Sequence, residues 1–354
     1  MTRACVSVGG LRGLGPAGAV RALADADRGR EVLRQTIPEF HSGAWRLVSY
    51  ELTGVWKTLG KYVVVCRISY RNGTSPHTLS ADIAAKLYRR DHGARGLRAL
   101  RWLWEAGFRP PARYRVPRPF GYSPERRALL QAFAPGTPWA DFLWSDPRGL
   151  SQVSARAADW LLRLQQTALQ AEAEGPEHDA ARVQRYARKL AARFPRCAQA
   201  LAALAERLIP SLQSQDLPLV PSHGDYHPGN VLLTSKSTTV IDHDHFGLRE
   251  AAFDAGYAIG QLLIMSYFRT GDFAMGARAA SGFWRRYALE GKATWRRVAI
   301  HVARTFLQSL HYELCVLLKN RDNRVELLDL WPRFSEQWLE SNGPATLENL
   351  VRRR

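Results

Sequence analysis

Apolar and polar residues alternate along three segments near the start of the chain, and this pattern predicts β-strands. WRLVSYEL, KYVVVCRISY and ADIAAKLY are rich in β-branched and aromatic residues and are separated by Gly, Asn and Pro. The next segment, ARGLRALRWLWEAG, repeats its leucines at helical spacing. RALLQAFAPG returns to a strand pattern before a Pro- and Gly-rich link. These elements predict a small β-rich lobe with one helix over residues 41–134.

The rest of the chain has mainly helical patterns. SARAADWLLRLQQTAL, ARVQRYARKLAARF and AQALAALAERLI are amphipathic, and one short strand pair is expected inside residues 230–242. We therefore expect an α+β fold with two lobes, the larger and mainly helical one spanning residues 135–354. Residues 1–40 are rich in Ala, Gly and Arg and are expected to form an N-terminal extension, partly flexible, with a short helix around residues 29–36.

Composition and charge narrow the class of protein. The 354 residues are 46% hydrophobic, which is enough to bury a core, and no apolar run approaches the roughly 18 residues of a membrane span. Gly and Arg in MTRACVSVGGLRGLG argue against a signal peptide, and four scattered cysteines fit the reducing cytoplasm. The net charge is +18, but the basic residues are mostly arginines dispersed along the chain, so nucleic-acid binding is not expected.

Carboxylates outnumber basic residues in the segment 201–250, which contains a candidate metal site. Asp225 and Asn230 lie in a loop made irregular by Gly and Pro, and a short hairpin separates Asn230 from Asp242. A hairpin returns its two ends to the same side, so we expect Asn230 beside Asp242. Carboxylate and amide oxygens suit Mg²⁺ bound to substrate phosphates. Asp244, two residues after Asp242, is the competing candidate for the carboxylate ligand.

The motifs HGDYHPGN and VIDHDHFG resemble the catalytic and metal-binding motifs of the aminoglycoside phosphotransferase/choline kinase family, which has the bilobal protein-kinase-like fold. The resemblance implies Mg²⁺-dependent transfer of the γ-phosphoryl group of ATP or GTP to a hydroxyl of a small molecule. It implies that Asp225 is the catalytic base and that Asn230 and Asp242 hold the metal. His223 and Asp254 are expected to support the loop.

The resemblance also implies a nucleotide site in the β-rich lobe. Lys86 in ADIAAKLYRR would reach the α- and β-phosphates, and Ala84, on the same face of a strand, would touch adenine. The segment Gln131, Ala132 and Phe133 resembles the hinge whose backbone groups bind the edge of the base.

Two features depart from the family pattern. The helix after Lys86 should carry a Glu that pairs with this lysine, but the plausible positions hold Arg95, Gly96 and Arg98, and Asp91 could serve only if the helix begins early. The phosphate-covering segment ELTGVWKTLGK lacks a GxGxxG pattern. The departures put the geometry of Lys86 in question and leave the metal site unaffected.

Two functions other than phosphoryl transfer are compatible with parts of the sequence. One is a zinc or di-iron hydrolase that would use a group of histidines, although Gly224 and Pro228 break any helix there; the histidines are His223, His227, His243 and His245. The other is a catalytically weak kinase-like module that binds nucleotide or polyanions. For an active enzyme, the net positive charge after residue 250 favours a neutral or anionic acceptor over a polycationic one.

Overall fold

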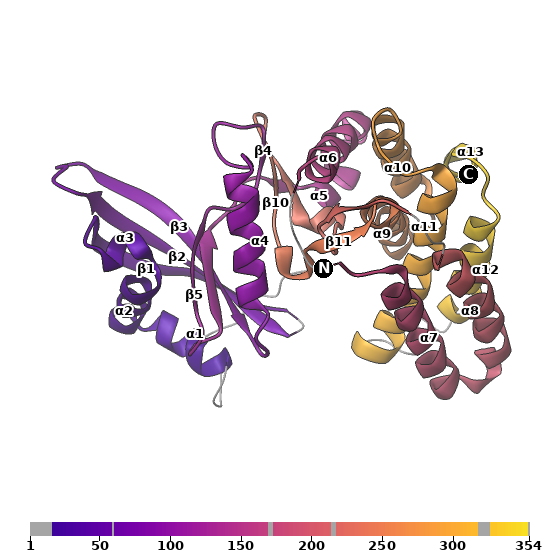
Figure 1. The fold of residues 1–354 in the computed structure, drawn as a ribbon, viewed down its shortest axis with the longest axis horizontal. Coiled ribbons are helices and arrows are strands. Elements are labelled where there is room, and N and C mark those ends of the chain that lie inside the picture. The colour runs from indigo at the N-terminus through magenta and orange to yellow at the C-terminus, as the bar shows by residue number, and fades with distance from the viewer. Residues whose placement is uncertain (1–15, 59, 169–172, 214–216, 318–325, 353–354) are drawn as a thin grey trace. The chain divides into compact units, whose positions relative to one another are not determined.

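Figure 1 shows the computed structural model, which describes residues 16–58, 60–168, 173–213, 217–317 and 326–352. The chain divides into two units, each with its own internal packing. The first consists of Met1–Gly136 and Thr234–His245, and the second of Thr137–Leu233 and Phe246–Arg354. The lobe boundaries expected at residues 40 and 134 remain predictions.

A five-stranded antiparallel sheet in the order β1-β2-β3-β6-β5 forms the framework of the first unit. Its strands are β1 (Trp45–Thr58), β2 (Lys61–Asn72), β3 (Thr78–Tyr88), β5 (Pro119–Ser123) and β6 (Ala128–Ala132). Strands β1, β2, β3 and β6 coincide with the segments for which the sequence pattern predicted strands, whereas β5 was not predicted. Two further strands, β4 (Tyr114–Arg115) and β10 (Thr238–Val240), pair in parallel, so the later segment 234–245 is tied to this unit.

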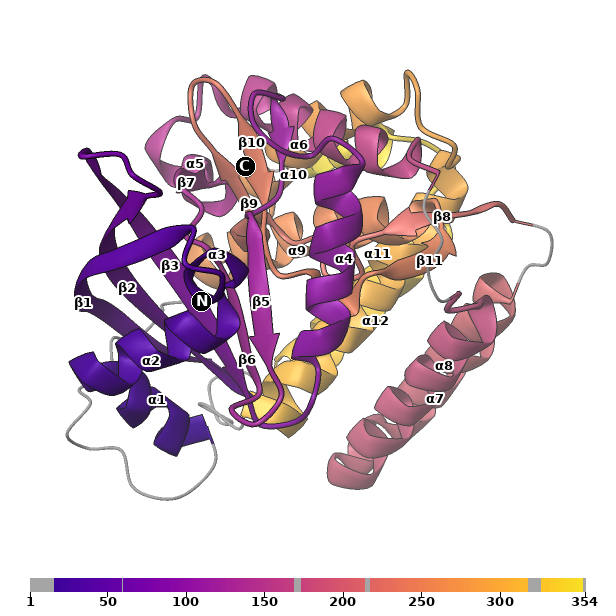
Figure 2. The same cartoon turned by 60° about the vertical axis from the view of Figure 1, so that its left-hand side comes forward.

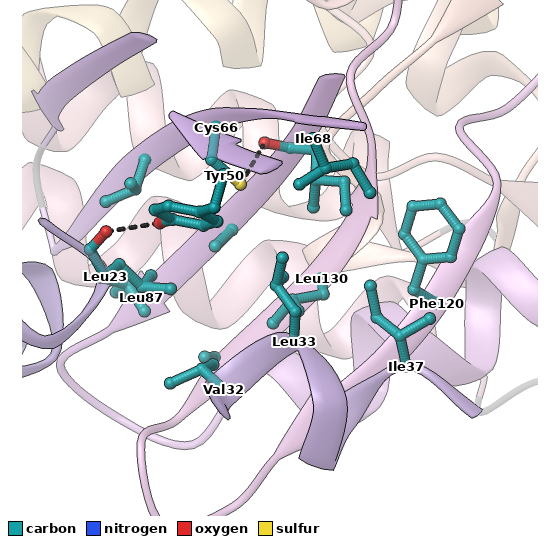
Figure 3. Packing of buried hydrophobic residues seen from close by; sticks show 14 of the residues in the cluster. Leu23, Val32, Leu33, Ile37, Tyr50, Cys66, Ile68, Leu87, Phe120 and Leu130 are labelled. Atoms are coloured by element: carbon teal, nitrogen blue, oxygen red, sulfur yellow. Dashed lines mark hydrogen bonds between the residues drawn. The ribbon is translucent and has the colours of Figure 1, made fainter. Parts of the chain in front are cut away.

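Three helices before the sheet cover one of its faces, as Figure 2 shows: α1 (Pro16–Ala24), α2 (Ala26–Thr36) and α3 (Pro38–His41). The sequence pattern predicted only one short helix here. Val32 and Leu33 of α2 are almost fully buried and pack with Ile83, Ala85 and Leu87 of β3 in one apolar cluster (Figure 3). Residues 16–41 therefore contribute to the core of the first unit, whereas residues 1–15 lie outside the described residues.

The opposite face of the sheet carries the candidate nucleotide-binding residues. In β3, Ala84 and Lys86 alternate with the core residues, as the strand pattern predicted. Helix α4 (Gly93–Glu105), which was predicted from its leucine spacing, packs against β6 and β5 and against the short helical turn η4 (His243–His245). This face is therefore bordered by α4 and by the turn that follows Asp242.

The second unit is mainly helical and is built around the apolar helix α9 (Ala252–Thr270), which packs against α10 and α11. The other helices are α5 (Trp139–Ser145), α6 (Leu150–Gln165), α7 (Pro176–Arg193), α8 (Ala198–Leu212), α10 (Ala274–Tyr287), α11 (Trp295–His311), α12 (Leu327–Leu339) and α13 (Ala345–Arg352), with short helical turns η2 (Pro195–Cys197) and η3 (Pro228–Asn230) and a π-helical segment η5 (Tyr312–Leu317).

Two short antiparallel strand pairs complete the second unit. β8 (Leu219–Ser222) pairs with β11 (Gly247–Glu250), and β7 (Thr137–Pro138) pairs with β9 (Val231–Leu233). Together the units confirm the predicted α+β class, with an antiparallel sheet in the N-terminal region and a mostly helical remainder. Among the described residues, no helix combines the length and the apolar character needed to cross a membrane.

Candidate active site

The loop that carries Asp225 begins where strand β8 ends at Ser222. Gly224 has φ of +77°, a left-handed conformation that favours glycine, and it turns the chain sharply out of the strand. After the turn, His227 caps the helical turn η3, because its Nδ1 accepts a hydrogen bond of 3.1 Å from the backbone N–H of Gly229. Turn and cap give the irregular loop a defined conformation.

Asp254, in the first turn of α9, holds this loop from behind. Its carboxylate accepts hydrogen bonds from the hydroxyl of Ser222 (2.9 Å) and from the backbone N–H groups of His223 (2.7 Å) and Gly224 (3.0 Å). Burial raises the pKa of Asp254. The charge of Arg249 and these hydrogen bonds lower it, but burial outweighs them. Asp254 therefore has a structural role, which is to hold the backbone of this loop in place.

His223 lies within the same support. Its side chain is fully buried, and its ring meets the rings of Trp160 and Tyr226 edge-on at centroid distances of 6.4 and 5.8 Å. Its Nδ1 accepts a hydrogen bond of 3.2 Å from the backbone N–H of Asp225. The ring therefore fixes the backbone at the candidate base.

Asp225 itself is more open, with 28% of its side chain exposed. The amide nitrogen of Asn230 donates to the backbone carbonyl of Asp225 at 3.0 Å and lies 3.5 Å from its Oδ2. Tyr257 of α9 faces the same carboxylate: burial first, and then the charge and hydrogen bond of Asp225, raise the pKa of this tyrosine well above its usual range. The arrangement is an accessible carboxylate on a fixed loop, as a general base requires.

In the first unit, Lys86 lies beside Asp242. Its Nζ is 3.0 Å from Asp242 Oδ1 and 3.6 Å from Asp244 Oδ1, and only 6% of its side chain is exposed. Asp242 has φ of +74°, an uncommon backbone conformation for a residue other than glycine. Burial alone would raise the pKa of Asp242, but the ammonium groups of Lys86 and Lys61 hold it well below its usual range. Asp242 is therefore ionised.

Lys61, at the start of β2, was not singled out from the sequence. Its Nζ lies 2.6 and 2.8 Å from the two carboxylate oxygens of Asp242 and 2.8 Å from Oδ2 of Asp244. Burial opposes the charge of Lys61, yet these two carboxylates raise its pKa above its usual value. Lys61 follows the β1–β2 hairpin, and its partner in the β2–β3 register is Tyr88, so no local sequence pattern indicated its contact with Asp242.

The second carboxylate beside Lys86 is Asp244, and no residue of α4 takes that role among the described residues. The helix begins at Gly93, and Asp91, which precedes it, accepts a hydrogen bond from the Tyr122 hydroxyl instead. A Cβ atom on Gly96 would lie 3.1 Å from Asp244 Oδ1, so the missing side chain of Gly96 leaves room for this carboxylate.

The segment Gln131 to Phe133 ends the strand next to β3. Gln131 is opposite Ala84 in the register, so its side chain shares a face with Ala84 and Lys86. The backbone N–H of Ala132 already donates to the carbonyl of Arg118, and that of Phe133 to the carbonyl of Asp82, each at 2.8 Å. Those two N–H groups therefore donate hydrogen bonds within the unit.

Within the described residues, no three His, Cys, Asp or Glu side chains converge as a metal site. The residues predicted from the sequence instead fall into two groups. Asp225, Asn230, His223 and Asp254 are together in the second unit, and Lys86, Ala84, Gln131 and Asp242 share the first.

The comparisons with known proteins agree with this fold. The model of the phosphotransferase enzyme family (APH) matches residues 69–301. A choline/ethanolamine kinase family protein from Mesorhizobium loti is 18% identical, with 92% of this chain and 98% of that chain covered and a TM-score of 0.54. Choline kinase from Cryptosporidium parvum Iowa II is 12% identical, with coverage of 92% and 99% and a TM-score of 0.58.

The ADP-bound aminoglycoside phosphotransferase APH(2'')-Ib is 10% identical, with coverage of 89% and 99% and a TM-score of 0.55. At these identities the three likenesses show a shared kinase-like fold. No curated protein matches the chain.

Proposed function

Because the chain belongs to the phosphotransferase enzyme family, we propose that it transfers the γ-phosphoryl group of ATP or GTP to a hydroxyl group of a small molecule. A cytoplasmic location, which the scattered cysteines favour, is part of the same proposal. Phosphoryl transfer depends mainly on positioning and on neutralising charge, and the two residue groups offer both.

The observation that carries the proposal is the anchored loop around Asp225. Asp254 accepts hydrogen bonds from two backbone N–H groups and one hydroxyl of the loop before Asp225, while the side chain of Asp225 is 28% exposed. A rigid backbone with an accessible carboxylate suits a base that orients an acceptor hydroxyl and takes its proton as the oxygen attacks the γ-phosphorus. The bond between that phosphorus and the bridging oxygen breaks, and the nucleoside diphosphate leaves.

Asn230 and Asp242 are the residues we assign to Mg²⁺. The amide nitrogen of Asn230 faces Asp225, which leaves its oxygen for a cation, and the low pKa of Asp242 keeps its carboxylate ionised. Both are hard oxygen donors of the kind Mg²⁺ prefers. When bound, the ion neutralises charge on the phosphates.

We assign Lys86 to the α- and β-phosphates and Ala84, with the segment Gln131 to Phe133, to the nucleobase. The register supports this assignment, because Ala84 and Gln131 are opposite each other on the face that carries Lys86.

Product analysis by mass spectrometry tests the reaction. The protein is incubated with Mg²⁺, ATP or GTP and a panel of hydroxyl compounds, and a phosphorylated product is expected. Asp225→Ala should lower kcat on the order of 10²–10⁴-fold and leave nucleotide binding intact. The control is Glu340→Ala, which removes an exposed carboxylate. Turnover near the wild-type rate in Asp225→Ala would exclude the assigned base. Nucleotide binding without any product would favour the catalytically weak module.

The acceptor we propose is neutral or anionic. Residues after 250, on which we expect the acceptor to dock, carry net positive charge, and a field of that sign slows the approach of a polycation. Steady-state assays would compare kanamycin-type aminoglycosides with neutral sugars and sugar acids. An aminoglycoside kcat/KM of about 10⁴ M⁻¹s⁻¹ or more, which is the lower end of the ordinary enzyme range, would contradict this choice.

A further inference from the structure

Lys61 and Lys86 project from the same face of the sheet. Lys61 is paired with Tyr88 and Val63 with Lys86 in the antiparallel register of β2 and β3, and directly paired residues share a face. The two ammonium groups converge on one atom, because Nζ of Lys61 lies 2.6 Å and Nζ of Lys86 3.0 Å from Oδ1 of Asp242. Two cations are thus held together at the carboxylate assigned to the metal.

The ammonium group of Lys61 is fully engaged by carboxylates. It has three N–H donors, and three carboxylate oxygens lie within 2.8 Å of it, two from Asp242 and one from Asp244. Only 16% of its side chain is exposed, although a lysine next to a hairpin turn can usually extend into water. The carboxylates around Lys61 therefore form a preorganised binding site for its ammonium group.

Tyr88 completes the surroundings of this lysine. Its hydroxyl donates to Oδ1 of Asp244 at 2.8 Å, and its ring centroid is 5.7 Å from Nζ of Lys61. Asp244 therefore accepts from Lys61 with one oxygen and from Tyr88 with the other. These contacts keep Asp244 in place independently of Asp242.

The charges explain why a second lysine is useful here. Two ammonium groups balance the carboxylates of Asp242 and Asp244. A nucleoside triphosphate carries more negative charge than one Mg²⁺ neutralises, and any contact that Lys61 gives up leaves Asp242 more available to the metal. Phosphate oxygens are the acceptors that can replace Asp242 in the contacts of both lysines.

We propose that Lys61 is a second phosphate-binding residue, whose ammonium group exchanges its contacts with Asp242 for contacts with phosphate oxygens when nucleotide binds. The ammonium group of Lys61 keeps its contact with Asp244 before and after nucleotide binds. The inference rests on the proposed function. Lys61 precedes the residues that the family model matches.

Calorimetric titration of the full-length protein tests the role of Lys61. The ligands are adenosine, ADP and the non-hydrolysable analogue AMP-PNP, the last with and without Mg²⁺. Lys61→Met should weaken binding of AMP-PNP with Mg²⁺ by about tenfold or more, the loss expected for one charged hydrogen bond. Adenosine affinity should change less than about twofold, because adenosine has no phosphate. A structural role alone would weaken adenosine and AMP-PNP equally.

Lys57→Met is the matched control. Lys57 lies on the same hairpin, is exposed, and is paired with Tyr62, whose side chain packs against the core on the other face of the sheet. Lys57→Met removes the same charge and should leave every affinity unchanged. If Lys61→Met fails to fold, Lys61→Gln carries the same test, since it keeps a hydrogen-bond donor without the charge.

Besides equal weakening of adenosine and AMP-PNP, two results would overturn the inference. Unchanged AMP-PNP affinity in Lys61→Met would mean that Lys61 makes no phosphate contact. Tighter Mg²⁺-dependent binding would mean that Lys61 only competes with the metal for Asp242. If either occurs while the wild type still makes a phosphorylated product, the inference alone fails. A wild type that binds no nucleotide and makes no product overturns the proposed function as well.

Discussion

Replacing Asp244 by Asn tests whether this carboxylate holds the two lysines. Asp244 lies 2.8 Å from Nζ of Lys61 and 3.6 Å from Nζ of Lys86, and only 9% of its side chain is exposed. Removing one partner from a buried ion pair destabilises a protein by about 3–5 kcal/mol. Asn retains an acceptor for the Tyr88 hydroxyl, and Asp242 still pairs with both lysines. We therefore expect the free energy of unfolding of the first unit to fall by about 3 kcal/mol.

Native-state hydrogen exchange, followed by mass spectrometry on peptides from β2 and β3, measures this loss in the first unit separately from the second. The control is Asp82→Asn, which breaks an ion pair with Arg67 on the same face of the same sheet. That pair is much more exposed, at 55% and 33% for the two side chains, so its loss should cost less than about 1 kcal/mol. Equal losses for Asp244→Asn and Asp82→Asn would refute the reasoning.

Three further predictions concern the metal, the pH dependence and the N-terminal helices. Asp242→Asn should raise the Mg²⁺ concentration needed for nucleotide binding more than Asp244→Asn does; the reverse order in a Mg²⁺ titration would make Asp244 the ligand. The pKa of Glu250 is lowered to about 2: burial opposes the shift, but Arg297 and His301 outweigh it. This stabilisation is present above pH 4.5 and is lost as the pH falls toward 2, so urea unfolding should show an acid-induced loss of about 3 kcal/mol that is absent in Glu250→Gln. Leu33→Ala should cost about 2–5 kcal/mol in the exchange of β2 and β3, because Leu33 is fully buried against the sheet, while exposed Arg34→Ala should cost almost nothing.

Local sequence pattern predicted much of this fold because its main elements have strong periodicity. The strands around residues 45–88 alternate β-branched and polar residues, and the helix at 93–105 repeats its leucines, so local sequence and tertiary packing favour the same structure. The helices over residues 16–41 were mostly missed. Their composition of Ala, Gly and Arg gives weak periodicity, and their burial depends on a sheet that forms later in the chain.

Asp225 and Asn230 could be grouped from the sequence because they lie five residues apart in one loop, and Asn230 donates a hydrogen bond to the Asp225 carbonyl. The partners of Lys86 could not be identified in this way. Lys61 reaches Asp242 through the register of two strands, and β10 joins the first unit by pairing with β4, more than a hundred residues earlier in the chain. No short-range pattern contains such pairings, so the lysine cluster becomes visible only in three dimensions.

The position of Asp244 gives a physical reason for the glycine in α4. The carboxylate that lies beside a lysine such as Lys86, which we assign to phosphates, can come from any neighbouring element. Here it comes from the turn after Asp242, and Gly96 supplies the space, since a Cβ atom there would approach Asp244 Oδ1 to 3.1 Å. A glutamate at position 96 would fill that space and place a third carboxylate beside Lys86. Gly96 and Asp244 therefore act together: the glycine leaves space for the carboxylate. The segment that carries Asp242, the metal-binding candidate, thus also positions the two lysines.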